Sequence, residues 1–225
     1  MIEDYLVINK KVYNHSAEDY KNKRLDPRNI SLTEKIVHPF IQYLNSQYPI
    51  RQKKILEIGP GAGISLSIFD REAFKLVAID ISDKMINASR EICPKCDYRE
   101  GNFLEYNFED LHFDGIFANR VIHTFPRNDA VMFLKKAKNL LNDNGLIGIT
   151  TNLTNESYEL FSVDEKNVDN PSYSSRFRRF WEEKDLLDVI RTAGLEGVYC
   201  EYYPYYVDKG NIKGINLGLR QENGK

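Results

Sequence analysis

The spacing of apolar and polar residues divides the chain into three regions. Between Lys53 and Thr151, short apolar runs alternate with segments whose apolar residues recur at helical spacing. The first pattern is typical of buried strands and the second of helices that pack on them. Repeated strand–helix units predict a parallel sheet with right-handed crossovers and helices on both faces. We expect strands near 54–57, 75–79, 97–100, 113–118 and 146–151, and helices near 64–69, 82–91 and 128–141.

The first region, residues 1–50, is helical in pattern and rich in polar residues. Pro27 should end one helix, and a second is predicted from Ser31, which would form a capping box with Glu34. Because both helices precede the first strand, we expect them to pack on or over the sheet as a lid.

The third region begins at Asn152, where the alternation stops. Residues 152–178 are polar and are predicted to form a loop, followed by a helix over 181–193. Two aromatic-rich apolar runs, 198–207 and 212–220, are joined by a polar turn, which indicates a hairpin.

The fold class predicted from these regions is a Rossmann-like, doubly wound α/β fold. Its seven-stranded sheet is mostly parallel, with one antiparallel edge strand from the C-terminal hairpin. We expect one domain over 1–225, which comprises a helical lid (1–50), a cofactor-binding core (51–151), a substrate-cap loop (152–180) and a C-terminal helix and hairpin (181–225).

Composition excludes several classes of function. The net charge of −2, with acids and bases interspersed, does not indicate a nucleic-acid partner. No apolar run is long enough to span a bilayer and no signal peptide is evident, so no membrane association and a cytoplasmic location are expected. Cys93 and Cys96 form a C-x-x-C pair without a second ligand pair, so no metal site is expected.

A glycine-rich turn follows the first predicted strand and ought to hold a ligand. Three glycines alternate after Glu57, and each removes a Cβ that would keep a ligand from the backbone. Ile64 and Leu66 stand where a dinucleotide fingerprint needs a small residue, and the Gly-Lys-Ser/Thr of a Walker loop is absent. An acid beside the turn suits an ammonium group better than a phosphate. The turn is Glu57-Ile-Gly59-Pro-Gly61-Ala-Gly63.

This E-x-G-x-G-x-G turn resembles the first motif of the class I S-adenosylmethionine-dependent methyltransferases, in their small-molecule branch. Further motifs extend the resemblance in the expected order, from Tyr13-x-x-x-Ala17-x-x-Tyr20 to the sequence near Gly218. The resemblance implies S-adenosyl-L-methionine as cofactor, methyl transfer to O or N of a small metabolite, and a monomer or homodimer.

The resemblance also assigns roles to residues at the predicted strand ends. Asp80 would accept hydrogen bonds from both ribose hydroxyls, since a carboxylate has two acceptor oxygens. Asn102 and the backbone after it would contact the adenine amine and ring, and the Asn119 carbonyl the ammonium. The cofactor-binding residues expected are Tyr13, Tyr20, Glu57, Gly59, Gly61, Gly63, Asp80, Ile81, Met85, Asn102, Phe103 and Asn119.

Methyl transfer from a sulfonium needs alignment and desolvation, and a base only if the nucleophile arrives protonated. His123, which follows the fourth strand, is the predicted base because its ordinary pKa suits proton removal at neutral pH. Packing on the cofactor or shaping of the pocket is the alternative role for His123. Arg120, or the arginines at 176, 178 and 179, could pair with an acidic substrate or lie in solvent.

The sequence is also compatible with two other functions. One is a protein that binds S-adenosylmethionine or S-adenosylhomocysteine without methyl transfer, such as a cyclase or a regulator. The other is an NAD(P)-dependent Rossmann oxidoreductase, against which the residues at positions 64 and 66 argue.

Overall fold

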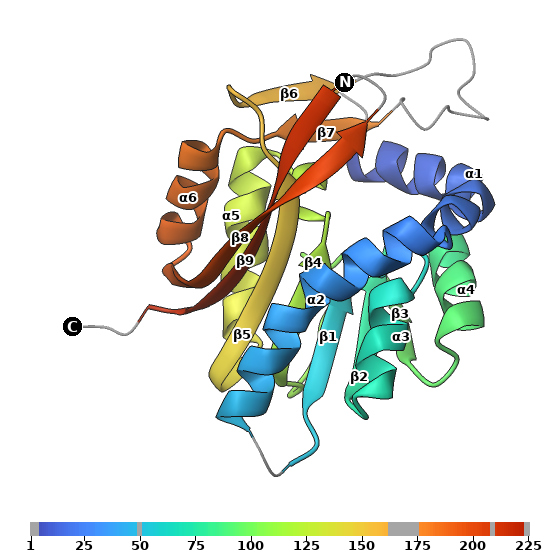
Figure 1. Cartoon of the computed structure of the whole chain (residues 1–225), viewed down its shortest axis with the longest axis vertical. Helices are drawn as coiled ribbons and strands as arrows, with labels where there is room; N and C mark the ends of the chain where they lie inside the picture. The colour runs from blue at the N-terminus through green and yellow to red at the C-terminus, as the bar shows by residue number, and fades with distance from the viewer. Residues whose placement is uncertain (1–4, 49–50, 162–175, 208–209, 223–225) are drawn as a thin grey trace.

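The computed structural model describes residues 5–48, 51–161, 176–207 and 210–222 (Figure 1). One sheet of seven strands runs through the molecule in the order β3-β2-β1-β4-β5-β9-β8. Its strands are β1 (Lys54–Ile58), β2 (Lys75–Asp80), β3 (Asp97–Glu100), β4 (Phe113–Asn119), β5 (Leu141–Asn152), β8 (Leu195–Val207) and β9 (Gly210–Gln221). The first five are parallel, and β9 is antiparallel to both β5 and β8. The predicted fold class is confirmed, and the hairpin completes one edge with β9 next to β5 and β8 outermost.

Helices cover both faces of this sheet (Figure 1). Apolar side chains of α2 and α3 pack on one face, and those of α5 and α6 pack on the other. The helix α1 lies against α4 and reaches the second, smaller sheet described below. The helices are α1 (Tyr5–Arg24), α2 (Pro27–Gln47), α3 (Ile64–Arg71), α4 (Asp83–Ile92), the short 3-10 helix η1 (Ile122–Thr124), α5 (Arg127–Asn139) and α6 (Glu183–Thr192).

The strand order reverses direction at β1, because β2 and β3 follow on one side of it and β4 and β5 on the other. In open α/β sheets, ligands bind in the crevice outside the carboxyl ends of the strands at such a switch point. The glycine-rich turn after β1 lies at this point.

The start of α2 corrects one prediction. The helix begins at Pro27, and the Asp26 carboxylate, not Ser31, caps it by accepting a hydrogen bond from the Arg28 N–H at 2.9 Å. Proline is favoured in the first turn because its missing N–H would have no partner there. Pro27 therefore opens α2, three residues after α1 ends at Arg24.

The predicted loop over 152–178 is wrong at its two ends, which pair as a second sheet. Strands β6 (Tyr158–Phe161) and β7 (Phe177–Phe180) are antiparallel, and residues 162–175 lie outside the described part of the chain. Tyr158 stacks on Phe180 with ring centroids 4.4 Å apart, and Arg179 donates to Glu159 directly opposite at 2.6 Å. Cross-strand aromatic and ionic pairs of this kind stabilise short ladders.

A buried carboxylate joins three segments at the amino ends of the strands. The Asp114 side chain on β4 is fully buried, and both of its oxygens accept from the Arg51 guanidinium, at 2.5 and 2.8 Å. It also accepts from the Lys54 N–H at 2.9 Å and from the Asn142 amide at 2.7 Å. The chain before β1 and the start of β5 are thereby fixed to β4.

Candidate functional site

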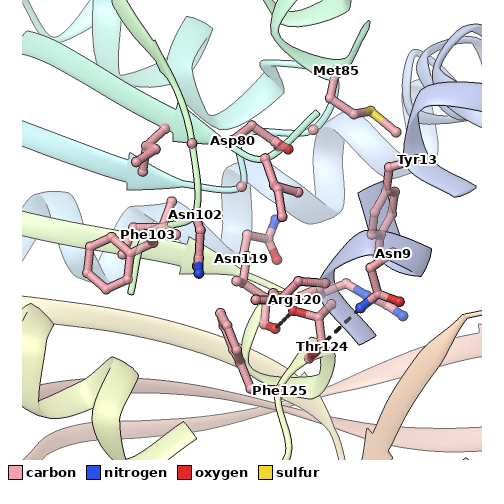
Figure 2. A pocket seen from close by; sticks show the side chains of 18 of the residues that line it. Asn9, Tyr13, Asp80, Met85, Asn102, Phe103, Asn119, Arg120, Thr124 and Phe125 are labelled. Atoms are coloured by element: carbon pink, nitrogen blue, oxygen red, sulfur yellow. Dashed lines mark hydrogen bonds between the residues drawn. The ribbon is translucent and has the colours of Figure 1, made fainter. Parts of the chain in front are cut away.

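A pocket opens at the carboxyl ends of β1, β2 and β4, beneath α1 (Figure 2). It encloses about 760 Å³ of empty space, including the part open to solvent. All but two of the predicted cofactor residues line it, namely Tyr13, Tyr20, Gly59, Gly61, Asp80, Ile81, Met85, Asn102, Phe103 and Asn119. The exceptions are Glu57 and Gly63.

The glycine-rich turn forms the floor of the pocket. Gly61 has a φ of +55°, and a Cβ there would lie 3.0 Å from the Tyr20 ring of α1. A side chain at this position would therefore be strained and would also fill the space between the turn and the lid helix. Gly63 serves packing instead, because a Cβ on it would lie 2.6 Å from the Ser89 hydroxyl of α4.

Glu57 lies behind the turn and is fully buried. The Ser65 hydroxyl donates to its Oε1, while Oε2 has no hydrogen-bond partner among the described residues. Burial raises the pKa of Glu57 to about 8, since desolvation disfavours the charged form. Its predicted contact with a ligand ammonium stays a prediction.

Replacing Glu57 with glutamine should flatten the pH dependence of folding stability. With a folded-state pKa of about 8 and an ordinary value of 4.5, the native state holds a proton that the unfolded chain loses between these values. The free energy of unfolding should therefore fall as pH rises from 4.5 to 8, by up to about 1.4 kcal/mol per unit. Urea unfolding of both proteins across this window measures it. The exposed Glu72→Gln should keep the wild-type slope, and an unchanged slope in Glu57→Gln would contradict a raised pKa.

The carboxyl end of β2 supplies the acid predicted to bind ribose. Asp80 accepts from the Ser82 N–H at 2.9 Å, and Ser82 in turn caps α4 by accepting from the Met85 N–H at 3.0 Å. The Asp80 carboxylate lies at the pocket wall (Figure 2). Burial raises its pKa to about 7. Ser82 therefore helps to position both Asp80 and Met85, whose side chain is buried.

The turn after β3 lies at the adenine end expected from the family. The Asn102 side-chain oxygen accepts from the Leu104 N–H at 3.1 Å, which holds the turn. An amide oxygen has two lone pairs, so one acceptor position is left for a ligand amine. Phe103 is buried and packs against Phe108 and Phe133, with ring centroids 5.9 and 5.2 Å away.

The carboxyl end of β4 forms the opposite wall. Thr150 of β5 donates to the Asn119 side-chain oxygen at 2.6 Å and accepts from the Arg120 N–H at 3.0 Å. Arg120 has a φ of +59°, which is uncommon for a residue with a side chain. It lines the pocket together with Thr124 and Phe125.

One face of the lid helix α1 lines the pocket. Leu6 and Asn9 line the pocket with Tyr13 and Tyr20, at spacings that place them on one side of a helix. Asn9 accepts from the Phe177 N–H of β7 at 2.9 Å and donates to the Thr124 carbonyl at 3.5 Å. Asn9 was not predicted from the sequence, although its spacing of four residues from Tyr13 places both on one face of a helix.

His123 is not among the residues that line the pocket, although Thr124 beside it is. Its pKa lies well below 6.5, chiefly because of burial, and then because of the positive charges of Arg120, Arg176, Arg178 and Arg24. The imidazole is therefore neutral at pH 7. Its role as a base stays a prediction.

The described residues contain no group of three or more His, Cys, Asp or Glu side chains that could hold a metal ion. Within the same residues, no helix is long and apolar enough to cross a membrane. Cys93 is buried, and burial raises the pKa of its thiol to about 11, so its thiolate is scarce at neutral pH.

Sequence comparison identifies relatives of the core. Residues 55–145 match the family model of a methyltransferase domain. An uncharacterized protein of Haemophilus influenzae is 32% identical over 121 residues, which are 48% of this chain and 46% of that protein. A ubiquinone biosynthesis O-methyltransferase of Pelagibacter ubique is 26% identical over 171 residues, 73% of this chain and 70% of the relative. The match thus spans about half the length of the first of these relatives.

The fold is similar to that of a solved enzyme complex, Burkholderia thailandensis 1,6-didemethyltoxoflavin-N1-methyltransferase with bound 1,6-didemethyltoxoflavin and S-adenosylhomocysteine. The TM-score is 0.73 at 15% sequence identity, over 98% of this chain and 90% of that chain. This likeness establishes the fold, and the family match adds the domain type. Residues 55–145 are thus similar in sequence to a methyltransferase domain, and the chain is similar in fold to a solved methyltransferase. The resemblance inferred from the motifs, and the cofactor class expected from it, are confirmed.

Proposed function

We propose that this chain is a single-domain, cytoplasmic S-adenosylmethionine-dependent methyltransferase, a monomer or homodimer, that methylates O or N of a small metabolite. The observation that carries the proposal is the pocket itself. It gathers the acid at the end of β2, the amide after β3 and the glycine-rich turn after β1 along one wall. These are the groups that a ribose, an adenine and an amino-acid tail require.

We assign each part of the cofactor to different residues of the pocket. Asp80 holds the ribose hydroxyls, Asn102 and the Phe103 backbone the adenine, and the Asn119 carbonyl the ammonium group. Tyr13 and Tyr20 face the amino-acid end from α1. The absent Cβ of Gly61 leaves room for that end between turn and lid.

S-adenosylmethionine supplies a methyl group on a sulfonium, whose leaving group is a neutral thioether. Held by these residues, the cofactor would supply an activated methyl group, whose bond to sulfur would break with its electron pair going to sulfur as a lone pair on the acceptor O or N bonds to the carbon. The acceptor's proton then leaves to a base or to water. The protein's part is to align the acceptor and to exclude water under α1, which raises the rate by positioning.

A methyl-transfer assay tests the function directly. The protein is incubated with isotopically labelled methyl donor and a metabolite extract, and labelled products are detected by mass. A labelled product that Asp80→Ala fails to make supports the proposal. Binding of S-adenosylhomocysteine with no product from any extract would favour a binding protein without transfer. Tight NADH binding with no response to S-adenosylhomocysteine would favour an oxidoreductase.

If His123 is the base, His123→Asn should lower kcat by roughly 100-fold or more. S-adenosylhomocysteine affinity should stay within about twofold, because a base of this kind acts on the acceptor's proton and not on the cofactor. A base must be neutral to act, and the pKa of His123 is lowered. Wild-type kcat should therefore fall only at pH values well below 6.5. The exposed His38→Asn serves as the matched control, and wild-type kcat in His123→Asn would leave His123 a structural residue.

A further inference from the structure

The pocket has two ends of different charge. The charged residues among its described lining are Asp80 and Arg120. Strand order places Asp80, at the end of β2, next to the adenine turn after β3, and places Arg120 beyond β1 at the end of β4. Figure 2 shows Asp80 and Met85 at one end of the pocket, and Arg120, Thr124 and Phe125 at the other.

Arg120 is held at this end by its backbone. Its N–H donates to the Thr150 carbonyl at 3.2 Å and to the Thr150 hydroxyl at 3.0 Å, which keeps it in the left-handed region. A glycine would adopt this conformation without strain. The residue here is an arginine instead, and Arg120 lines the pocket.

Further positive charge surrounds the Arg120 end. The Arg176 side chain is buried, and its guanidinium carbon lies 5.8 Å from the ring centre of Tyr13, which lines the pocket. The positive charges of Arg120, Arg176, Arg178 and Arg24 also lower the pKa of His123, after the larger effect of burial. The acids Glu159 and Asp185 both pair with Arg179, and Asp185 also pairs with Arg127. A low-dielectric region lined by one sign of charge favours a ligand of the opposite sign.

Apolar side chains complete the same end. Phe125 is buried and lines the pocket with Leu6 and Val121. These surfaces suit the flat or aliphatic body of a ligand, and a guanidinium suits a carboxylate or phosphate attached to that body.

We propose that the methyl acceptor is a small organic anion with an apolar or aromatic body, whose anionic group is bound by the Arg120 guanidinium. This rests on the proposed function and names its substrate class. The anionic group orients the acceptor through its contact with Arg120. The nucleophilic O or N lies elsewhere on the same molecule and faces the methyl group, between Arg120 and the cofactor residues of β1 and β2.

The experiment separates a metabolite extract on an anion exchanger at pH 8 and assays each fraction with labelled methyl donor. Transfer activity should be found in the retained fraction. With the acceptor purified from it, Arg120→Gln should raise KM by about 10- to 100-fold, and Arg120→Lys should restore part of the loss. S-adenosylhomocysteine affinity should stay within about twofold, which also shows that the variants fold. Arg71→Gln, which removes an exposed guanidinium paired with Glu34 on the far side of α3, is the matched control.

Three results would overturn the inference. Transfer activity confined to the unretained fraction would show that the acceptor is not an anion. If Arg120→Gln weakened S-adenosylhomocysteine but not methylthioadenosine, which lacks the carboxylate, Arg120 would serve the cofactor instead. Transfer in no fraction, with S-adenosylhomocysteine bound normally, would remove the proposed function and this inference with it.

Discussion

Replacing Asp80 with alanine is expected to weaken S-adenosylhomocysteine binding by roughly 100-fold or more. Each hydrogen bond from a ribose hydroxyl to a carboxylate contributes about 1.5–3 kcal/mol, and two are lost. Isothermal titration calorimetry measures the effect. Asp19→Ala, which removes an exposed carboxylate from α1, should bind like the wild type. Unchanged affinity in Asp80→Ala would exclude the ribose role.

The pKa of Asp80 adds a pH signature to this prediction. Burial raises it to about 7, and only the carboxylate form accepts from both hydroxyls. Affinity should therefore strengthen as pH rises through 7 and then level off. Asp80→Asn should bind weakly with no such rise. A pH-independent wild type would show that the carboxyl group is already ionised below this window.

Asp114→Ala should lower the free energy of unfolding by about 2–4 kcal/mol, because the hydrogen bonds to a fully buried carboxylate are lost, while the half-exposed Arg51 can turn to solvent. The substitution also leaves the Lys54 N–H and the Asn142 amide without their acceptor. Urea unfolding at pH 7 measures the loss, and cofactor affinity measured well below the unfolding transition should be kept. The exposed Asp143→Ala, from the same corner of the molecule, should change stability by less than about 0.5 kcal/mol.

The sign of the pH dependence gives a second check on Asp114. Hydrogen bonds from Arg51, Lys54 and Asn142 outweigh its desolvation and lower its pKa below 3.8. Its stabilising effect is therefore present above about pH 4 and is lost as pH falls through the lowered value. Asp114→Ala should show a shallower loss of stability in acid than the wild type. Parallel acid unfolding curves would show that Asp114 is not a titrating group of the transition.

The core could be predicted from the sequence because its signals are local. Strands β1, β2 and β4 are short, mostly apolar runs, and each ends at or just before a marker residue, namely Gly59, Asp80 and Asn119. In a parallel sheet, consecutive strand ends meet at one edge, so the pocket followed from the order of the motifs.

The missed features depend on contacts between distant segments. Pairing of Tyr158 with Phe180 is not visible in either four-residue strand alone. Asn9 enters the site only because α1 packs across it to reach Phe177. For His123, distance from a strand end cannot specify which way a ring faces. The 3-10 turn η1 directs adjacent residues to different sides, so that Thr124 lines the pocket and His123 does not.

The position of β9 has a consequence for how this protein is made. The strand latest in chain order does not close the sheet from outside but inserts between β5 and β8. Its side chains Ile215, Leu217 and Leu219 are at most 2% exposed, in the core shared with α5 and α6. During synthesis the β5 edge stays uncovered until β9 has left the ribosome tunnel, and an open edge is prone to wrong pairing. The strands of the cofactor-binding half can pair earlier, so β9 joins the sheet after the strands around the ligand site have paired.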